Sequence, residues 1–229
     1  MHGAWHGGWC WARVAPLLRA QGHRVFCPTL TGLGERAHLL SRQVNMTTHI
    51  EDVVGVLESE ELSDVVLCGH SYGGMVITGV AARARARIRQ LVYLDSAVVE
   101  DSQSWSDAHT PQMQADRRKL AEPSGGVSMP VPNAEVFGLR RPEDLEWVQR
   151  RLTPQPFAPY DQKLLWGGPV GNGLPRVYVD CTDPVYAGLN PVKDRLRGQP
   201  GWPFIELKTG HDAMVSAPEE TARLLLRYA

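Results

Sequence analysis

The segment Gly69-His70-Ser71-Tyr72-Gly73 places a serine between two glycines in a G-x-S-x-G pattern. A continuous apolar run at 64–68 precedes it, and a small, apolar run typical of a helix follows it at 73–85. A sharp turn from a buried strand into a helix strains the backbone of the serine, and only glycine leaves room beside it. The pattern therefore predicts that Ser71 is a nucleophile at the carboxyl end of a sheet, rather than part of an ordinary tight turn.

A serine hydroxyl is a poor nucleophile at its free pKa and needs a general base beside it. Of the eight histidines, His211 is the best candidate, because Thr209-Gly210-His211 follows an expected strand at 204–208 and precedes the last expected helix. In a parallel sheet, this position lies at the same edge as Ser71. Without the G-x-S-x-G pattern, His211 would read as a solvated loop side chain.

The base in turn needs a carboxylate that fixes its tautomer and stabilises the imidazolium. Asp183 is preferred, because it follows the expected strand 176–180 and gives the chain order serine, acid, histidine that is typical of such a turn. Asp95 is the main rival, since it ends the strand 91–95 just after the helix that follows Ser71. Asp180 and Asp212 are weaker candidates. Asp183 also reads as a simple turn residue before a proline.

A second glycine-rich element, His2-Gly3-Ala4-Trp5, opens the chain. It predicts that the amide of Ala4, together with the amide of Tyr72 at the start of the helix, forms an oxyanion hole. The aromatic side chains near this element, and one in the middle of the chain, are expected to line the substrate pocket. These pocket candidates are Trp5, His6, Trp9 and Trp105.

Together these residues resemble the α/β-hydrolase superfamily, in the branch of plant hydroxynitrile lyases, plant methylesterases and bacterial pyrethroid esterases, and the chain also resembles bacterial hydrolases of benzimidazole carbamates. The resemblance rests on HGAWHGGWCW at 2–11, GHSYGGM at 69–75, CTD at 181–183 and TGHDAM at 209–214. It implies Ser71 as nucleophile, His211 as base and Asp183 as acid. Pro184 stands where an acidic pair is familiar, which keeps Asp95 open as the acid.

Two departures concern the lyases of this branch. They carry a lysine directly after the catalytic histidine and tend to carry a cysteine after the serine, where this chain has Asp212 and Tyr72. The resemblance therefore implies an esterase or carbamate hydrolase acting through a covalent acyl- or carbamoyl-serine. A hydroxynitrile lyase and a non-catalytic receptor for a small ligand are the rival functions.

Short β-branched runs alternate with helical patterns in the first and last thirds of the chain, which predicts an α/β fold with a mostly parallel sheet covered on both faces. Expected strands include 23–28, 64–68, 91–95, 176–180 and 204–208. Capping boxes at Thr48–Glu51 and Ser216–Glu219 predict helix starts. The strand signal vanishes at 96–173, so residues 1–95 and 174–229 are expected to form the core and 96–173 a helical lid.

One feature conflicts with this picture. A central strand should lead into His2-Gly3, and without it backbone groups of both neighbouring strands would lack partners. Either further residues precede Met1 or the first strand is absent in this form; we expect about half a dozen further residues, the usual length of a strand.

Composition narrows the function classes. The 229 residues carry 24 Lys and Arg against 25 Asp and Glu, so no basic surplus favours a nucleic acid. No apolar run approaches the ~18 residues of a membrane span, and no signal peptide is evident. The four cysteines lack C-x-x-C spacing and indicate reduced thiols in a cytoplasmic protein. We expect no metal, no cofactor, a small-molecule partner, and a monomer or small homo-oligomer.

Overall fold

A four-stranded parallel sheet lies at the centre of the computed structural model, which describes residues 1–229. Its strands follow the order β1, β2, β5, β6, with bounds Val65–His70, Ile88–Leu94, Arg176–Cys181 and Phe204–Leu207. The register aligns Cys68 with Val92, and Val92 with Val177. Because all four strands are parallel, their carboxyl ends meet at one edge, where the sequence places Ser71, Asp95 and His211.

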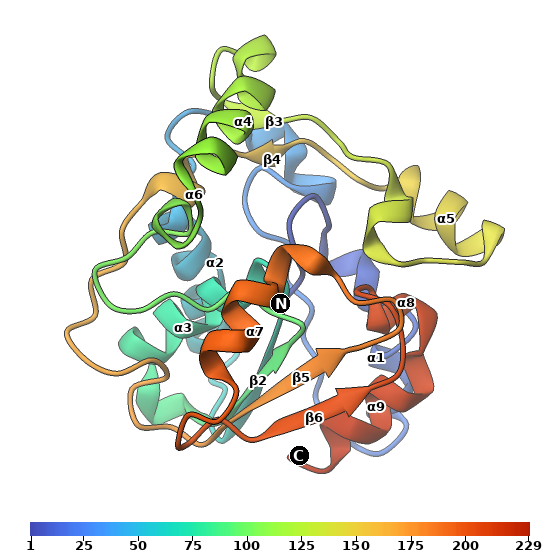
Figure 1. Ribbon diagram of the computed structural model, residues 1–229. Coiled ribbons are helices and arrows are strands. Elements are labelled where there is room, and N and C mark those ends of the chain that lie inside the picture. Colours follow the sequence, from blue (N-terminus) through green and yellow to red (C-terminus); the bar gives the residue numbers. More distant parts are fainter.

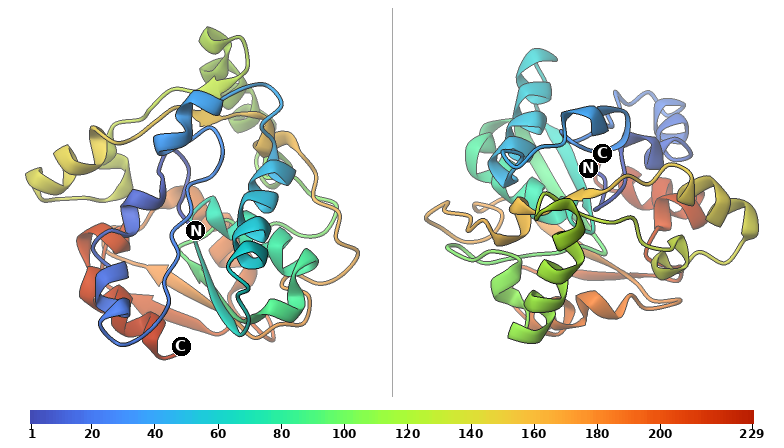
Figure 2. Two further views of the ribbon diagram at one scale, coloured as in Figure 1. Left: turned by 180° about the vertical axis from the view of Figure 1, so that it is seen from behind. Right: turned by 90° about the horizontal axis from the view of Figure 1, so that it is seen from above.

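Helices cover both faces of this sheet (Figures 1 and 2). Leu91 and Tyr93 of β2 pack in the cluster that holds α2 (Met46–Ser59), α3 (Gly73–Arg83) and α7 (Asn190–Leu196). Val92 and Leu94 pack instead with α1 (Ala15–Arg19), α8 (Ala213–Ser216) and α9 (Pro218–Leu226). This division follows from the alternation of side chains along a strand. The expected α/β architecture is confirmed.

The segment 96–173, called the cap below, lies above the carboxyl edge of the sheet (Figure 1). It contains α4 (Pro111–Ala121), α5 (Pro142–Gln149) and α6 (Ala158–Asp161). It also contains two antiparallel strands, β3 (Ser128–Met129) and β4 (Gln155–Pro156), which correct the expectation of a segment without strands. Two residues per strand are too few to give a recognisable alternation.

Along the whole chain, short 3-10 helices occupy Gly8–Trp11, Gly34–Leu39, Arg85–Arg87, Ser106–Ala108, Glu122–Ser124, Ala134–Phe137 and Ala187–Leu189.

Two expected helix starts are displaced. Helix α2 begins at Met46, and its capping box joins the side chains of Asn45 and Thr48 rather than Thr48 and Glu51. Helix α9 begins at Pro218 rather than directly after Ser216, and Ser216 does not cap it, because the Ser216 hydroxyl bonds to Thr209 and to the Asp212 carbonyl.

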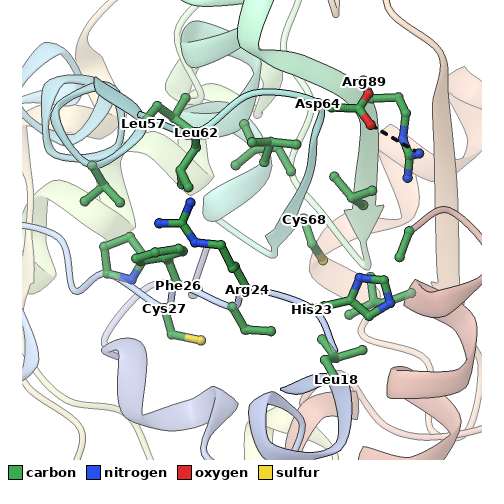
Figure 3. Close-up of a pocket in the computed structure, with 18 of the residues that line it drawn as sticks. Leu18, His23, Arg24, Phe26, Cys27, Leu57, Leu62, Asp64, Cys68 and Arg89 are labelled. Atoms are coloured by element: carbon green, nitrogen blue, oxygen red, sulfur yellow. Dashed lines mark ion pairs between the residues drawn. The ribbon is translucent and has the colours of Figure 1, made fainter. Parts of the chain in front are cut away.

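The open edge of β1 borders a cavity of about 500 Å³ (Figure 3). The extended segment 23–28 forms the opposite wall, and the cavity separates it from β1, so it pairs with no strand. This corrects the expected strand at 23–28. Met1 alone pairs with the end of β1, through its amino group to the Cys68 carbonyl and its carbonyl to the His70 amide. This cavity is lined by residues at the start and middle of β1, away from the carboxyl edge.

All four cysteines are free. None of the helices is both long enough and apolar enough to serve as a transmembrane span.

Candidate active site

Ser71 occupies a strained turn between β1 and α3. Its φ of 52° lies in the left-handed region that residues other than glycine rarely adopt. The flanking glycines are required by space, because a Cβ on Gly69 would lie 2.5 Å from the Gly73 carbonyl oxygen and one on Gly73 would lie 2.7 Å from the His2 carbonyl oxygen. Ser71 is partly exposed, and its hydroxyl forms no hydrogen bond within the chain. The geometry is that of a nucleophile held at the start of a helix.

His211 follows β6, and its ring is held by Asp95 at the end of β2. The Nδ1 atom of His211 donates to Oδ2 of Asp95 over 2.6 Å, and both side chains are buried. Because Nδ1 carries the proton, Nε2 is left as the basic nitrogen. The His211 ring lies 4.6 Å, between centroids, from that of His70, the neighbour of Ser71. Ser71, His211 and Asp95 therefore lie at one edge of the sheet.

Asp95 remains ionised in this buried position. Burial opposes its ionisation, but the hydrogen bond from His211 and the charge of Lys193 outweigh burial, so the pKa of Asp95 lies below its usual value. Asp95 also has a positive φ of 41°. A second strained residue at the same edge is typical of a functional site.

The preference for Asp183 as the acid is corrected by the structure. The Asp183 carboxylate is 41% exposed and accepts a hydrogen bond from Arg140 of the cap at 2.5 Å. It does not contact His211. Strand β5 ends at Cys181, and the isolated bridge between Thr182 and Val185 turns Asp183 away from the sheet edge. Asp95 holds the position behind the imidazole.

The two weaker candidates for the acid are engaged with different partners. Asp180 pairs with Lys193 at 2.7 Å, and Asp212 pairs with His6 at 3.0 Å. Among these four aspartates, Asp95 is therefore the one that forms a hydrogen bond with the His211 ring.

The amides of Ala4 and Tyr72 are the two candidate oxyanion donors. Both residues are buried, and neither amide donates to an acceptor within the chain. Gly3 lies against the nucleophile, since a Cβ there would be 2.9 Å from the Ser71 Cβ. Buried donors without acceptors are costly unless a ligand uses them. This pair is suited to stabilise negative charge developing beside Ser71.

Cap residues hold the loop that carries Ala4. The Trp5 amide donates to the Gln155 side-chain oxygen at 2.9 Å, and the Trp5 carbonyl accepts from the Thr153 amide at 3.0 Å. Trp5 needs this support because its φ is 64°. The cap therefore supports the loop that carries the Ala4 amide.

Two of the four expected pocket residues, His6 and Trp9, are engaged in contacts with other protein groups. His6 is buried, and its two ring nitrogens bind the Ala4 carbonyl and the Asp212 carboxylate at 2.7 and 3.0 Å. Trp9 stacks on His6 and meets Trp147 edge-on. The expectation that His6 and Trp9 line the pocket is therefore corrected, because both are packed into the support of the loop.

The other two expected pocket residues remain candidates. Trp5 is only partly buried and follows the Ala4 amide directly. Trp105 is buried beneath Arg117 of the cap, in the same apolar cluster as Tyr72 and Tyr160.

A scan of family models gives a match to the alpha/beta hydrolase family over residues 1–224. The chain belongs to this family. A carbendazim hydrolyzing esterase from Nocardioides sp. (strain SG-4G) is 43% identical over 236 residues, which cover 98% of this chain and 96% of the relative. Salicylic acid-binding protein 2 from Nicotiana tabacum is 25% identical over 100% of this chain and 95% of its own length.

Solved structures agree with this alpha/beta hydrolase fold. An extracellular alpha/beta-hydrolase from a Paenibacillus species superposes with a TM-score of 0.85 at 24% identity, covering 100% of this chain and 97% of the other. A pyrethroid hydrolase from Sphingobium faniae JZ-2 gives a TM-score of 0.73 at 22% identity, over 99% and 94% of the two chains. The fold and the resemblance inferred from the motifs are confirmed.

Several residues of this alpha/beta hydrolase site were not expected from the sequence. Tyr186 stacks on the His211 ring at 4.1 Å between centroids, and Phe137 lies 6.2 Å away in a nearly parallel orientation. Lys193 approaches Asp95 to 2.6 Å. The segments that carry these residues show no motif, so only the three-dimensional arrangement identifies them. His, Cys, Asp and Glu side chains form no group of three or more suited to a metal ion.

Proposed function

We propose that this alpha/beta hydrolase is a serine hydrolase that cleaves small apolar carboxylic or carbamate esters without a cofactor. The observation that carries the proposal is the hydrogen bond between His211 Nδ1 and Asp95, placed at the same sheet edge as the strained Ser71. A serine, an imidazole and a buried carboxylate in this relationship supply a nucleophile, a base and its orienting partner.

In the first half of the reaction, the Ser71 hydroxyl attacks the carbonyl carbon while His211 Nε2 accepts its proton. The carbonyl oxygen becomes an oxyanion that binds the amides of Ala4 and Tyr72. Asp95 stabilises the imidazolium formed at His211. Amide donors of this kind each lower the barrier by about 3 kcal/mol.

Collapse of this intermediate expels the alcohol, which leaves with the proton held on His211. The acyl or carbamoyl group is then bound to Ser71 as an ester. His211 next deprotonates a water molecule, which attacks the same carbonyl and releases Ser71. From an N-aryl methyl carbamate these steps give methanol and an N-aryl carbamic acid, which loses carbon dioxide to leave the arylamine.

The 43% identical carbendazim hydrolyzing esterase supports carbamate esters, including methyl benzimidazol-2-ylcarbamate, as substrates. The aromatic side chains of Trp5 and Tyr186 beside the catalytic residues suit a flat, apolar substrate. A lyase function is not favoured. The residue after the catalytic histidine, Asp212, is a buried carboxylate paired with His6, so no cation is available there to bind cyanide.

A single substitution tests the proposal. Ser71→Ala removes the nucleophile, so kcat on p-nitrophenyl acetate and on methyl benzimidazol-2-ylcarbamate is expected to fall at least ~1,000-fold. The matched control is Ser63→Ala, at an exposed serine just before β1, which is expected to retain full activity. Retention of more than about a tenth of the rate by Ser71→Ala would exclude Ser71 as the nucleophile.

A further inference from the structure

Lys193 is a lysine buried beneath the sheet edge that carries the catalytic residues. Its side chain is only 4% exposed, although lysine is rarely buried without a partner. Its ammonium nitrogen lies 2.6 Å from Oδ1 of Asp95 and 2.7 Å from Oδ1 of Asp180. Lys193 thus bridges two carboxylates, one of which holds the catalytic imidazole.

The fold explains how these three residues meet. Tyr93 and Tyr178 pack in the same apolar cluster as α7; Asp180 lies two residues after Tyr178 within β5, and Asp95 directly follows β2. Side chains two residues apart on a strand share a face, so Asp180 points toward the helix that supplies the lysine. The Asp95 carboxylate reaches the same ammonium nitrogen from the turn that follows β2. Within α7, Val192 and Leu196 anchor the helix in the core and bury Lys193 with them.

The charges in this cluster balance. Asp95 and Asp180 are opposed by Lys193 and by Arg197, which pairs with the second oxygen of Asp180. Removing Lys193 would leave one uncompensated negative charge in a buried position, next to His211. Such a charge stabilises an imidazolium and destabilises the free imidazole that a general base must offer.

We propose, on the basis of the serine hydrolase function above, that Lys193 is a positioning residue for the triad. It binds the Asp95 oxygen that His211 does not use. It thereby fixes the plane of the carboxylate, keeps Asp95 ionised, and offsets part of its charge beside the imidazole of His211.

Other titratable groups also surround Asp95 and His211, and a substitution at Lys193 changes none of these residues. They come from the N-terminal loop, β1, β5, the loop between β5 and α7, and the segment after β6: His6, His70, Tyr178, Asp180, Cys181, Tyr186 and Asp212. Of these, Asp180 is the group that shares Lys193 directly. Its removal therefore has the opposite electrostatic effect.

The test is the pH dependence of kcat/KM on p-nitrophenyl acetate. In Lys193→Met, the acidic limb is expected to move upward by about one pH unit, so kcat/KM near pH 6 falls roughly ten-fold more than at high pH. The matched control is Lys163→Met. Lys163 is an exposed lysine of the cap, and its ammonium nitrogen pairs loosely with Oδ2 of Asp107, at 4.0 Å. Its acidic limb is expected to coincide with that of the unmodified protein.

A second variant keeps the test decisive if Lys193→Met does not fold. In Asp180→Asn, Lys193 is left to Asp95 alone, and the acidic limb is expected to move downward. Acidic limbs that stay in place in both variants, or that move in the reverse directions, would overturn the proposed role of Lys193. Because the activity of each variant must still be abolished by Ser71→Ala, failure of this proposal is distinguishable from failure of the proposed hydrolase function.

Discussion

The Nδ1 atom of His211 lies 2.6 Å from Oδ2 of Asp95, across a buried contact between residues 116 positions apart in the chain. In the proposed mechanism, this contact makes Asp95 the carboxylate that supports the general base. Asp183 lies two residues beyond the end of the neighbouring strand β5, and it turns outward to Arg140. The two aspartates therefore provide a matched comparison.

Asp95→Asn is expected to lower kcat by about 10³–10⁴-fold, because an amide cannot hold the required tautomer of His211 or stabilise its imidazolium. Asp183→Asn is expected to change kcat less than about three-fold, since it loses only an exposed ion pair. Steady-state kinetics on one ester checks both variants. A larger loss in Asp183→Asn would reverse the assignment of the acid.

Glycine at position 73 is expected to be essential because a Cβ there would press on the His2 carbonyl at 2.7 Å and displace the oxyanion loop. Gly73→Ala is expected to lower the free energy of unfolding by about 1–3 kcal/mol and to reduce activity further. Gly55→Ala, in the interior of α2 where no atom lies within 4 Å of the new Cβ, is expected to stabilise by about 0.5–1 kcal/mol. Urea denaturation of both variants checks the contrast, and equal effects would contradict it.

Gln155 of the cap is expected to influence catalysis through the loop that carries Ala4. Its side-chain oxygen accepts from the Trp5 amide at 2.9 Å, and Gln155 is completely buried. Gln155→Ala is expected to lower kcat about ten-fold, because one lost hydrogen bond loosens the neighbouring oxyanion donor.

The control for this prediction is Gln162→Ala. Gln162 accepts from the Met46 amide at the start of α2, so its loss is expected to affect stability but not kcat. Similar kcat values for the Gln155 variant and the unmodified protein would show that the cap does not position the oxyanion loop.

The buried pair of His6 and Asp212 predicts a pH-dependent contribution to stability. Burial lowers the pKa of His6, but Asp212 outweighs burial, so this pKa lies above its ordinary 6.5. Burial raises the pKa of Asp212, but His6 outweighs burial, so this pKa lies below its ordinary 3.8. The His6 contribution is present below pH 6.5 and is lost as pH rises through the raised pKa. The Asp212 contribution is present above pH 3.8 and is lost as pH falls through the lowered pKa.

Both contributions are therefore complete between pH 3.8 and 6.5. Near pH 5, His6→Gln is expected to cost about 3–5 kcal/mol in the free energy of unfolding, and the difference from the unmodified protein is expected to shrink toward pH 9. His38→Gln, at an exposed histidine, serves as the control in the same urea titrations. A difference that stays constant with pH would contradict an ionised pair.

Local patterns were sufficient to predict the parts of the site that depend on neighbouring residues in the chain. The strained Ser71 and its two glycines belong to one turn, so the sequence alone identifies that turn. His211 was predicted because it follows a strand and precedes a helix. These two predictions use only the rule that the carboxyl ends of parallel strands meet at one edge of the sheet.

Relationships that depend on the direction of a side chain could not be predicted in the same way. Asp95 and Asp183 both follow a strand, and only the outward turn after β5 separates them. The sequence favours His6 as a pocket residue. Its contact with Asp212, 206 positions away in the chain, is visible only in the structure. The segment 23–28 has the composition of a strand, but pairing needs a neighbour, and a cavity lies in that place.

The most direct test of the proposed mechanism is to trap the covalent intermediate. The protein is incubated with the serine-directed reagent diethyl p-nitrophenyl phosphate, and the modified peptide is located by mass spectrometry. We predict one diethylphosphoryl group per chain, on Ser71, formed at a rate that falls strongly in Asp95→Asn and little in Asp183→Asn. Complete inactivation with the label on another residue, or full esterase activity with Ser71 unlabelled and unreactive, would contradict the account.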